Sequence, residues 1–175
     1  MLKKAVQNHL KRFNKLRRLG PVVKVTTLLD CHPEHAWEEV QKPSLLHHVA
    51  APLLRFEAIN PPLFPQRWRE GEYLVRMKLF GVLPLGTQWI GLEFPPNHAP
   101  SVRYQARDNG HGQLMRRWDH LITLELTPDG RTRYTDRVVV NAGLFTPLAR
   151  LFAVLFYRHR QQRWRKLVRR NFAQA

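Results

Sequence analysis

Two neighbouring stretches, residues 114–126 and 132–140, place most of their apolar side chains at even-numbered positions and polar ones at odd positions. This alternation is typical of β-strands, whose side chains point to opposite faces of the sheet in turn. The two apolar sets can share one face only if an odd number of residues separates the strands. The sequence TPDGR between them fits, because Thr127 can pair with Arg131 across a three-residue loop that ends in glycine. The sequence therefore predicts an antiparallel hairpin.

The register of this hairpin brings two polar side chains together on the apolar face. Ile122 lies opposite Asp136 and His120 opposite Val138, so that His120 and Asp136 become diagonal neighbours about 7–8 Å apart at the backbone. An inward carboxylate can hold an imidazole in one tautomer, as a general base requires. A buried pair that only satisfies its own hydrogen bonds is the other interpretation. His120 and Asp136 are thus the candidate catalytic residues.

The rest of the chain reads as strands and short helices that lead to one long helix. Residues 22–29 are β-branched and predict a strand, and Pro33 and Pro43 are typical of the first turn of short helices. Further strands are expected at 52–58, 72–80, 85–94 and 101–107, and loops at 60–62, 95–97 and Asp108-Asn109-Gly110. A basic helix is expected to start at Pro147 and run to about Phe172. Its apolar side could cover the inner face of the sheet through Leu148, Leu151, Phe152, Leu155 and Phe156.

Charge is concentrated at the two ends of the 175-residue chain. The net charge is +16, yet residues 1–20 hold seven basic residues and residues 150–175 hold eight, and neither segment contains an acid. Residues 2–19 also carry an apolar stripe at helical spacing, and Gly20-Pro21 ends it. We expect a basic amphipathic helix there, which docks either on protein or on an anionic membrane surface.

Three kinds of macromolecular partner are open for this chain. The basic residues near the ends alternate with apolar anchors that suit an interface or a bilayer boundary through residues 1–20 and 158–172. Among these anchors are Phe13, Trp164, Leu167 and Val168. Nucleic acid is an alternative, since polycations bind any polyanion, but no recognised nucleic-acid module is present. A homo-oligomer is the third.

Several classes of function lack their signature here. Cys31 is the only cysteine, so an internal disulfide and a Cys-rich zinc site are excluded and a reducing compartment is expected. The histidine pairs at 32/35 and 47/48 have no known metal-site spacing, so no metal or other cofactor is predicted. Nucleophile-elbow, phosphate-loop and dinucleotide motifs are absent. No stretch is long enough to span a membrane, and no secretory signal is apparent, although the basic start is similar to a mitochondrial presequence without its serines and threonines. We expect a cytoplasmic protein that associates peripherally with membranes.

Four short stretches resemble one branch of a known superfamily. They are DNGHG at 108–112, WDH at 118–120, TRYTDR at 132–137 and FYRHR at 156–160. They are similar to SRPBCC proteins that occur alone or beside an epimerase-like domain. The order of the elements also looks like the helix-grip fold of the START/Bet v 1-like (polyketide cyclase and lipid-transport) superfamily. The resemblance covers roughly residues 22–165 and implies an α+β fold with a curved antiparallel sheet of about seven strands around a long C-terminal helix. A basic helical arm, residues 1–20, would precede a ligand-binding domain, residues 21–175.

The resemblance further implies a hydrophobic tunnel between the sheet and the long helix. Its members range from carriers of lipids, sterols and quinones to cyclases and hydrolases, so the fold gives a pocket without giving a reaction. The candidate ligand-binding residues are Phe56, Tyr73, Met77, Tyr104, Trp118, His120, Tyr134, Asp136, Phe152, Phe156 and Arg158. We expect a binder or carrier of a hydrophobic small molecule, with a cyclase or dehydratase that uses His120 and Asp136 as the alternative.

Overall fold

One seven-stranded antiparallel sheet forms the framework of the computed structural model, which describes residues 22–96 and 99–173. The order across the sheet is β1-β7-β6-β5-β4-β3-β2. The strands are β1 (Val22–Leu29), β2 (Leu54–Asn60), β3 (Gly71–Leu79), β4 (Leu83–Glu93), β5 (Val102–Gly112), β6 (Arg117–Leu126) and β7 (Thr132–Asn141). The expected helix at 2–19 and the expected boundary at residue 20 lie outside the described residues.

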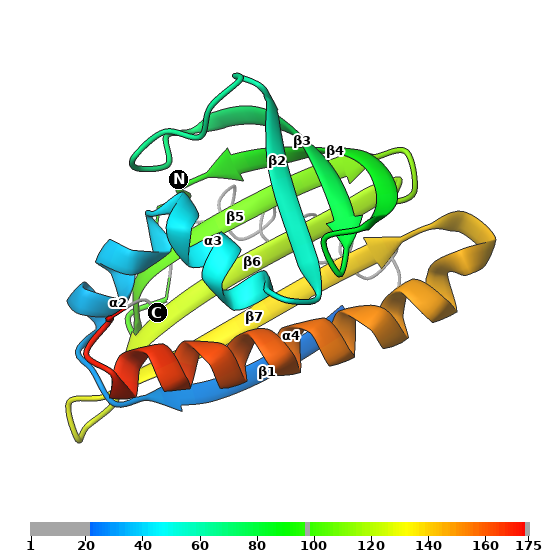
Figure 1. Cartoon of the computed structure of the whole chain (residues 1–175). Helices are drawn as coiled ribbons and strands as arrows, with labels where there is room; N and C mark the ends of the chain where they lie inside the picture. The colour runs from blue at the N-terminus through cyan, green and yellow to red at the C-terminus, as the bar shows by residue number, and fades with distance from the viewer. Residues whose placement is uncertain (1–21, 97–98, 174–175) are drawn as a thin grey trace, which may run out of the picture.

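Two short helices and one long helix lie on one side of this sheet (Figure 1). Helices α2 (Pro33–Val40) and α3 (Pro43–Ala50) follow β1, and each starts with a proline, whose missing N–H has no helical partner at that position. A 3-10 turn, η1 (Gly143–Phe145), leads into α4 (Thr146–Arg169). Helix α4 packs against β1, β7 and α3. The predicted α+β helix-grip architecture is confirmed.

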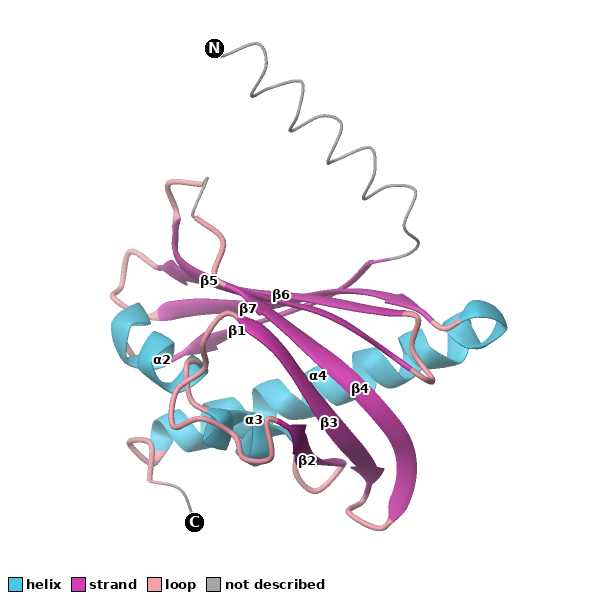
Figure 2. Cartoon of the chain, turned by 90° about the horizontal axis from the view of Figure 1, so that it is seen from above, coloured by secondary structure: helices cyan, strands magenta, loops and turns pink. Residues whose placement is uncertain are grey.

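The sheet is strongly curved. Seen from above, β3 and β4 turn away from the plane of β5, β6 and β7 toward the side that carries α4 (Figure 2). The sheet and the helix therefore enclose an interior between them, which is where the predicted inward faces of the strands point.

The predicted hairpin between β6 and β7 is confirmed. Ile122 pairs with Asp136 and His120 with Val138. The N–H of Thr127 donates to the carbonyl of Arg131 at 2.9 Å, and Gly130 has a φ of +81°, a conformation that favours glycine. The two-residue periodicity and the loop length thus sufficed to fix this register.

The predicted loop at Asp108-Asn109-Gly110 is wrong, because β5 continues through these residues to Gly112. The glycines serve close approach between β4 and β5 instead of a turn. A Cβ atom on Gly110 would lie 2.8 Å from the carbonyl oxygen of Trp89, and one on Gly112 only 2.6 Å from that of Thr87. Glycine allows the neighbouring backbone to come this near.

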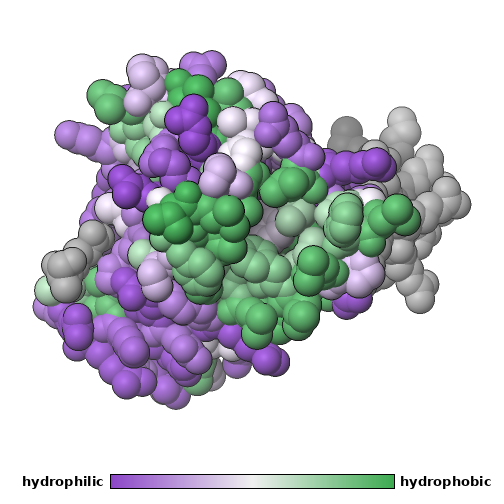
Figure 3. Space-filling model, turned by 45° about the vertical axis from the view of Figure 1, so that its right-hand side comes forward, coloured by the Kyte–Doolittle hydropathy of each residue, from purple (hydrophilic) through white to green (hydrophobic). Residues whose placement is uncertain are grey.

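The face that α4 turns to the sheet also differs from the expected one. The leucines at 148, 151 and 155 are 66%, 58% and 56% exposed, and only Phe152 and Phe156 of the predicted apolar side turn inward. The buried face consists of Ala149, Ala153, Phe156, Tyr157, Arg160, Gln161, Trp164, Leu167 and Val168. Small and polar side chains fit where the helix lies close to β1 and β7. The leucines therefore remain on the outer side of the helix. Figure 3 shows an apolar surface on this side of the molecule.

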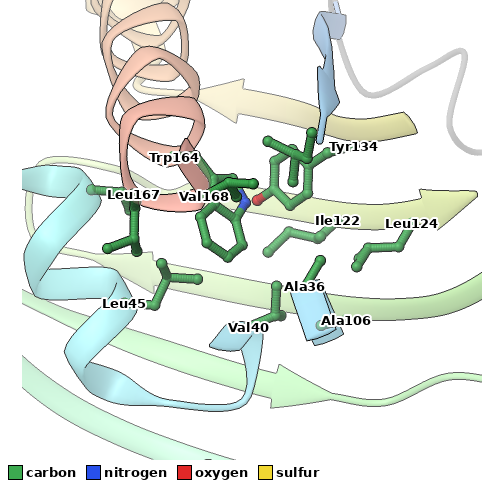
Figure 4. Packing of buried hydrophobic residues seen from close by; sticks show 12 residues of the cluster. Ala36, Val40, Leu45, Ala106, Ile122, Leu124, Tyr134, Trp164, Leu167 and Val168 are labelled. Carbon is green, nitrogen blue, oxygen red and sulfur yellow. The ribbon is translucent and has the colours of Figure 1, made fainter. Parts of the chain in front are cut away.

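The interior is filled at one end. Around the C-terminal half of α4, Trp164, Leu167 and Val168 pack against α2, α3 and the sheet (Figure 4). Tyr134 meets Trp164 edge to face, with 6.1 Å between the ring centroids. The predicted membrane anchors Trp164, Leu167 and Val168 are therefore core residues, at most 7% exposed, and are not available to a bilayer.

Candidate functional site

The other end of the interior is hollow. A cavity of about 130 Å³ lies between the curved sheet, α3 and the N-terminal half of α4. Cavities of about 150 Å³ with apolar walls hold a benzene molecule, so this one has room for about one aromatic ring or a short hydrocarbon segment. Its wall is mostly apolar.

Polar groups are few in this wall and meet on the strands β5 and β6. Asp108 of β5 pairs directly with His120 of β6, and both side chains line the cavity. Gln88 and Arg160 line it too and are at most 7% exposed. A small set of polar groups in an apolar hollow is the usual make-up of a small-molecule site.

A fully buried carboxylate stands behind His120. Asp136 is 0% exposed, and its Oδ1 lies 2.8 Å from His120 Nε2. Tyr134 donates its hydroxyl to Oδ1 at 3.0 Å, and the side-chain amide of Gln161 donates to Oδ2 at 2.9 Å. Arg160 Nε lies 3.8 Å from Oδ1. Burial alone would raise the pKa of Asp136, but the hydrogen bond from His120 and the charge of Arg160 outweigh it, so the pKa is lowered and the carboxylate is ionised.

This arrangement defines the state of His120. Burial lowers the pKa of His120 more than Asp136 raises it, so the imidazole is neutral near pH 7. Since an ionised carboxylate only accepts hydrogen bonds, Nε2 carries the proton and Nδ1 keeps a free lone pair. The hydrogen bond to Asp136 thus fixes the tautomer, as the sequence analysis expected of an inward carboxylate.

Asp108 differs from Asp136 in that its carboxyl group holds its proton. Burial raises its pKa to about 8, against the effect of the Gly91 N–H, which donates to Oδ1 at 3.0 Å. The residue is partly exposed, and what it faces is the cavity. At neutral pH the carboxyl is therefore mainly protonated and can donate a hydrogen bond. A neutral donor next to a neutral histidine can bind a hydroxyl or carbonyl oxygen.

Another buried acid, Asp119, belongs to the outer face of β6. Arg107 binds it through two parallel hydrogen bonds of 2.8 and 2.9 Å, and Arg117 binds it as well. Burial would raise the pKa of Asp119, but these two guanidinium groups lower it. Asp119 is thus part of a structural ion pair and not of the cavity.

The candidate ligand-binding residues fall into two groups in the structure. Six of them line the cavity: Phe56, Met77, Trp118, His120, Phe152 and Phe156. The other five do not line it: Tyr73, Tyr104, Tyr134, Asp136 and Arg158.

Each residue of the second group has another place. Tyr73 packs on Trp68, and Tyr104 stacks on Trp37 near α2. Tyr134 and Asp136 are buried behind the cavity wall and support it. Arg158 is exposed, so it neither reaches Asp136 nor enters the cavity, and Arg160, two residues on, takes that place.

Asp108, Gln88 and Arg160 were missed by the sequence analysis. The sequence does hold a signal for Asp108, because Tyr104 and Ala106 fall on one face of the strand expected at 101–107 and the same alternation continues to Asp108. The Asp-Asn-Gly sequence was read as a turn instead. For Arg160 the sequence holds no such signal, since the orientation of a helix around its axis depends on what it packs against.

Solved structures with the same fold define the class of this protein. A crystal structure of a protein from Thermus thermophilus and a structure of a START superfamily protein from Mycobacterium smegmatis match with TM-scores of 0.61 and 0.59, each at 12% identity. The matches cover 87% and 86% of this chain and 100% and 99% of those chains. The Zhui aromatase/cyclase from Streptomyces sp. R1128 matches with a TM-score of 0.50 at 14% identity, over 85% of this chain and 90% of that chain. The protein has the START/Bet v 1-like fold.

The family is shown by sequence. Residues 27–170 match the model described as "Domain of unknown function (DUF8410)", and the chain belongs to this family. A comparison with curated proteins found no match. Within the described residues, no helix is long and apolar enough to cross a membrane, and no group of three or more His, Cys, Asp or Glu side chains could hold a metal ion.

Proposed function

We propose that this protein binds a hydrophobic small molecule, such as a lipid, a quinone or a polyketide-like compound, in the cavity between the sheet and α4. The observation that carries the proposal is the distribution of polarity in the cavity wall. The wall is apolar apart from two places. Polar side chains meet around Asp108 and His120, whereas Lys42, between α2 and α3, lies apart from them and is paired with Glu39. The charge of Arg160 is paired with Asp136. An apolar ligand would gain from leaving water, and one polar group would set its orientation.

The polar end of the cavity supports a neutral head group on this ligand. The protonated Asp108 donates, and Nδ1 of His120 accepts. Arg160 is charged, but Asp136 lies 3.8 Å from it and compensates that charge. A neutral oxygen function such as a hydroxyl, a ketone or a quinone carbonyl therefore fits better than a carboxylate or a phosphate.

The proposal includes work at an anionic membrane surface, where such ligands reside. Exposed basic side chains on the C-terminal half of α4, with Arg158, Arg165 and Arg169 among them, would provide electrostatic attraction. The seven basic residues of the segment 1–20 would add to this positive charge. The apolar anchors Trp164, Leu167 and Val168 take no part, because they are buried.

Binding is tested with the purified full chain and a neutral one-ring probe, 4-methylphenol, whose affinity is measured by isothermal titration calorimetry. Leu85→Trp and Ile90→Phe each place extra volume in the cavity wall, and we expect each to weaken probe binding at least about tenfold. Leu28→Trp, at an exposed site on β1, is the matched control. Solvent extraction followed by mass spectrometry would identify a copurified ligand. If both wall variants bind the probe as tightly as the parent, the cavity is not a binding site.

A cyclase- or dehydratase-type enzyme is the second candidate. It is favoured by one observation, a neutral His120 in the cavity wall whose tautomer Asp136 fixes at 2.8 Å. His120 would then act as the base on a polyketide-like substrate, with Asp136 as a positioning residue. His120→Ala should abolish turnover and leave affinity for the substrate unchanged. If the parent chain shows no turnover and His120→Ala only weakens binding of the compound, the binding role is favoured instead.

A further inference from the structure

Nine large apolar side chains are exposed near one end of α4. We call them the apolar platform: Phe80, Val82, Leu83, Leu114, Leu144, Phe145, Leu148, Leu151 and Leu155. Each is between 54% and 97% exposed. They come from η1 and the first half of α4, from the β3–β4 turn and from the segment before β6. Figure 3 shows apolar side chains gathered on this face of the molecule.

The pattern on α4 is not a scatter of single residues. Leu144, Leu148, Leu151 and Leu155 follow one another at steps of four, three and four, which places them in one stripe along the helix. Helix α4 packs on the sheet with the opposite face, so the stripe has no partner within the described chain. An exposed apolar surface of this extent marks an interaction site.

The charges around the platform have one sign. No aspartate or glutamate occurs in residues 73–92, 109–118 or 137–175, the segments that supply all nine side chains. Glu57, the acid on neighbouring β2, is held by Lys78 at 2.8 Å. Arg116 lies at the edge of the platform, 3.6 Å from the position that a Cβ on Gly143 would occupy.

The same helix stripe changes from apolar to basic along its length. After Leu155 it continues at steps of three and four through Arg158, Gln162, Arg165 and Arg169, and all four are exposed. The outer side of α4 therefore offers hydrocarbon at its N-terminal half and positive charge at its C-terminal half. Leucines that enter the acyl region and arginines that meet phosphates are what the boundary of an anionic bilayer accommodates.

The platform is also continuous with the mouth of the cavity. Leu114 belongs to both and, at 54%, it is the most exposed of the described residues that line the cavity. Phe152, Leu85 and Met115, which line the cavity next to it, are partly exposed. The cavity thus opens within the apolar surface.

We propose that the apolar platform is a membrane-docking surface that seats α4 on an anionic bilayer with the cavity mouth facing the acyl chains. A hydrophobic ligand would then pass between bilayer and cavity without crossing water. The passage of ligand rests on the proposed function, because it needs a cavity that binds ligand. The docking of the platform on a bilayer does not require that the cavity binds a ligand.

The test is flotation of the full chain with vesicles of phosphatidylcholine alone and of equal parts phosphatidylcholine and phosphatidylglycerol. The parent chain should bind the anionic vesicles, and Leu148→Ser/Leu151→Ser should bind them at least about tenfold more weakly. Leu28→Ser/Leu63→Ser, which alters two exposed apolar residues away from the platform, is the matched control and should bind like the parent. Leu148→Phe/Leu151→Phe keeps the apolar surface and should retain binding.

The outcomes separate this proposal from the function. Probe binding without vesicles should be the same in the serine variant and the parent, because the altered residues are not in the cavity wall. If probe binding is absent in both while the serine variant loses vesicle binding, the platform stands and the ligand-binding role fails. If the serine variant floats like the parent, the platform is not the docking surface. If the serine variant loses the self-association that the parent shows in sedimentation, while its flotation with vesicles is unchanged, a second copy covers the platform and the proposal is overturned.

Discussion

At the scale of single residues, neighbouring acids in one fold are held in opposite states. Asp136 is as deeply buried as any side chain described here, yet three hydrogen bonds and a guanidinium group keep it ionised. Asp108, on the next strand but one, has the cavity in front of it and a single backbone donor, so burial decides its state. What differs is the number of partners, not the residue type.

Asp108 gives a pH-dependent prediction. Its pKa is raised from 3.8 to about 8 in the folded state, so the folded chain holds the proton more tightly than the unfolded chain between these values. The contribution of Asp108 to stability is therefore present below about pH 4 and is lost as the pH rises toward 8. Asp108→Asn should stabilise the protein at about pH 8.5, by more than about 1 kcal/mol, and should have little effect near pH 4.

Urea denaturation of both chains at these two pH values measures this difference. Asp129→Asn is the control with the opposite sign. Arg131 and Thr127 lower the pKa of Asp129 to about 2, so Asp129→Asn should destabilise the protein both at pH 8.5 and near pH 4, and this effect should fade only as the pH falls toward 2. A gain in stability for Asp108→Asn that is the same at both pH values would show that Asp108 is not protonated in the folded protein.

At the scale of elements, the close contact between β4 and β5 depends on glycine. The sequence DNG that usually marks a turn lies inside a strand because the neighbouring backbone needs the space. The two strands carry Gln88 and Asp108 into the cavity wall, so their approach also positions the site.

Gly112→Ala tests this contact. The new Cβ would lie 2.6 Å from the Thr87 carbonyl oxygen, which is backbone and can move only with its strand. We expect a loss of about 1–3 kcal/mol in the free energy of unfolding, measured by urea denaturation. His111→Ala, on the adjacent exposed residue, should change it by less than about 0.5 kcal/mol. Equal small effects would mean that the strands tolerate a wider separation.

At the scale of the whole molecule, α4 has two halves with different tasks. Its C-terminal half closes the filled end of the interior through Trp164, and its N-terminal half covers the hollow end and presents leucines outward. Stability should therefore come mainly from the C-terminal half, and interaction from the other.

Two substitutions on this helix compare the halves. Trp164→Ala removes a side chain that is 0% exposed, and we expect a cost of about 3–5 kcal/mol. Leu151→Ala, at 58% exposure, should cost no more than about 0.5 kcal/mol. Thermal or urea unfolding of the two variants measures both values. A large cost at Leu151 would show that the leucine stripe is covered within the folded chain.

The sequence by itself determined the sheet and the register that brings His120 to Asp136. Alternation with a period of two and a loop of defined length are local properties, and they leave one choice of face for each strand. This is why the β6–β7 pairing could be predicted, whereas the helix-grip architecture was implied by the resemblance to the START/Bet v 1-like superfamily.

Only the tertiary structure decided which side of α4 is buried, where the interior is hollow and which residues line the hollow. Helix α4 has apolar residues on two sides, so the pattern alone favoured the leucines, but the curved sheet accepts the side with alanines, Arg160 and Trp164. The same packing leaves Tyr134 and Asp136 behind the cavity wall and brings Asp108 into it. Such choices depend on the fit between two surfaces distant in sequence, and no local pattern contains that information.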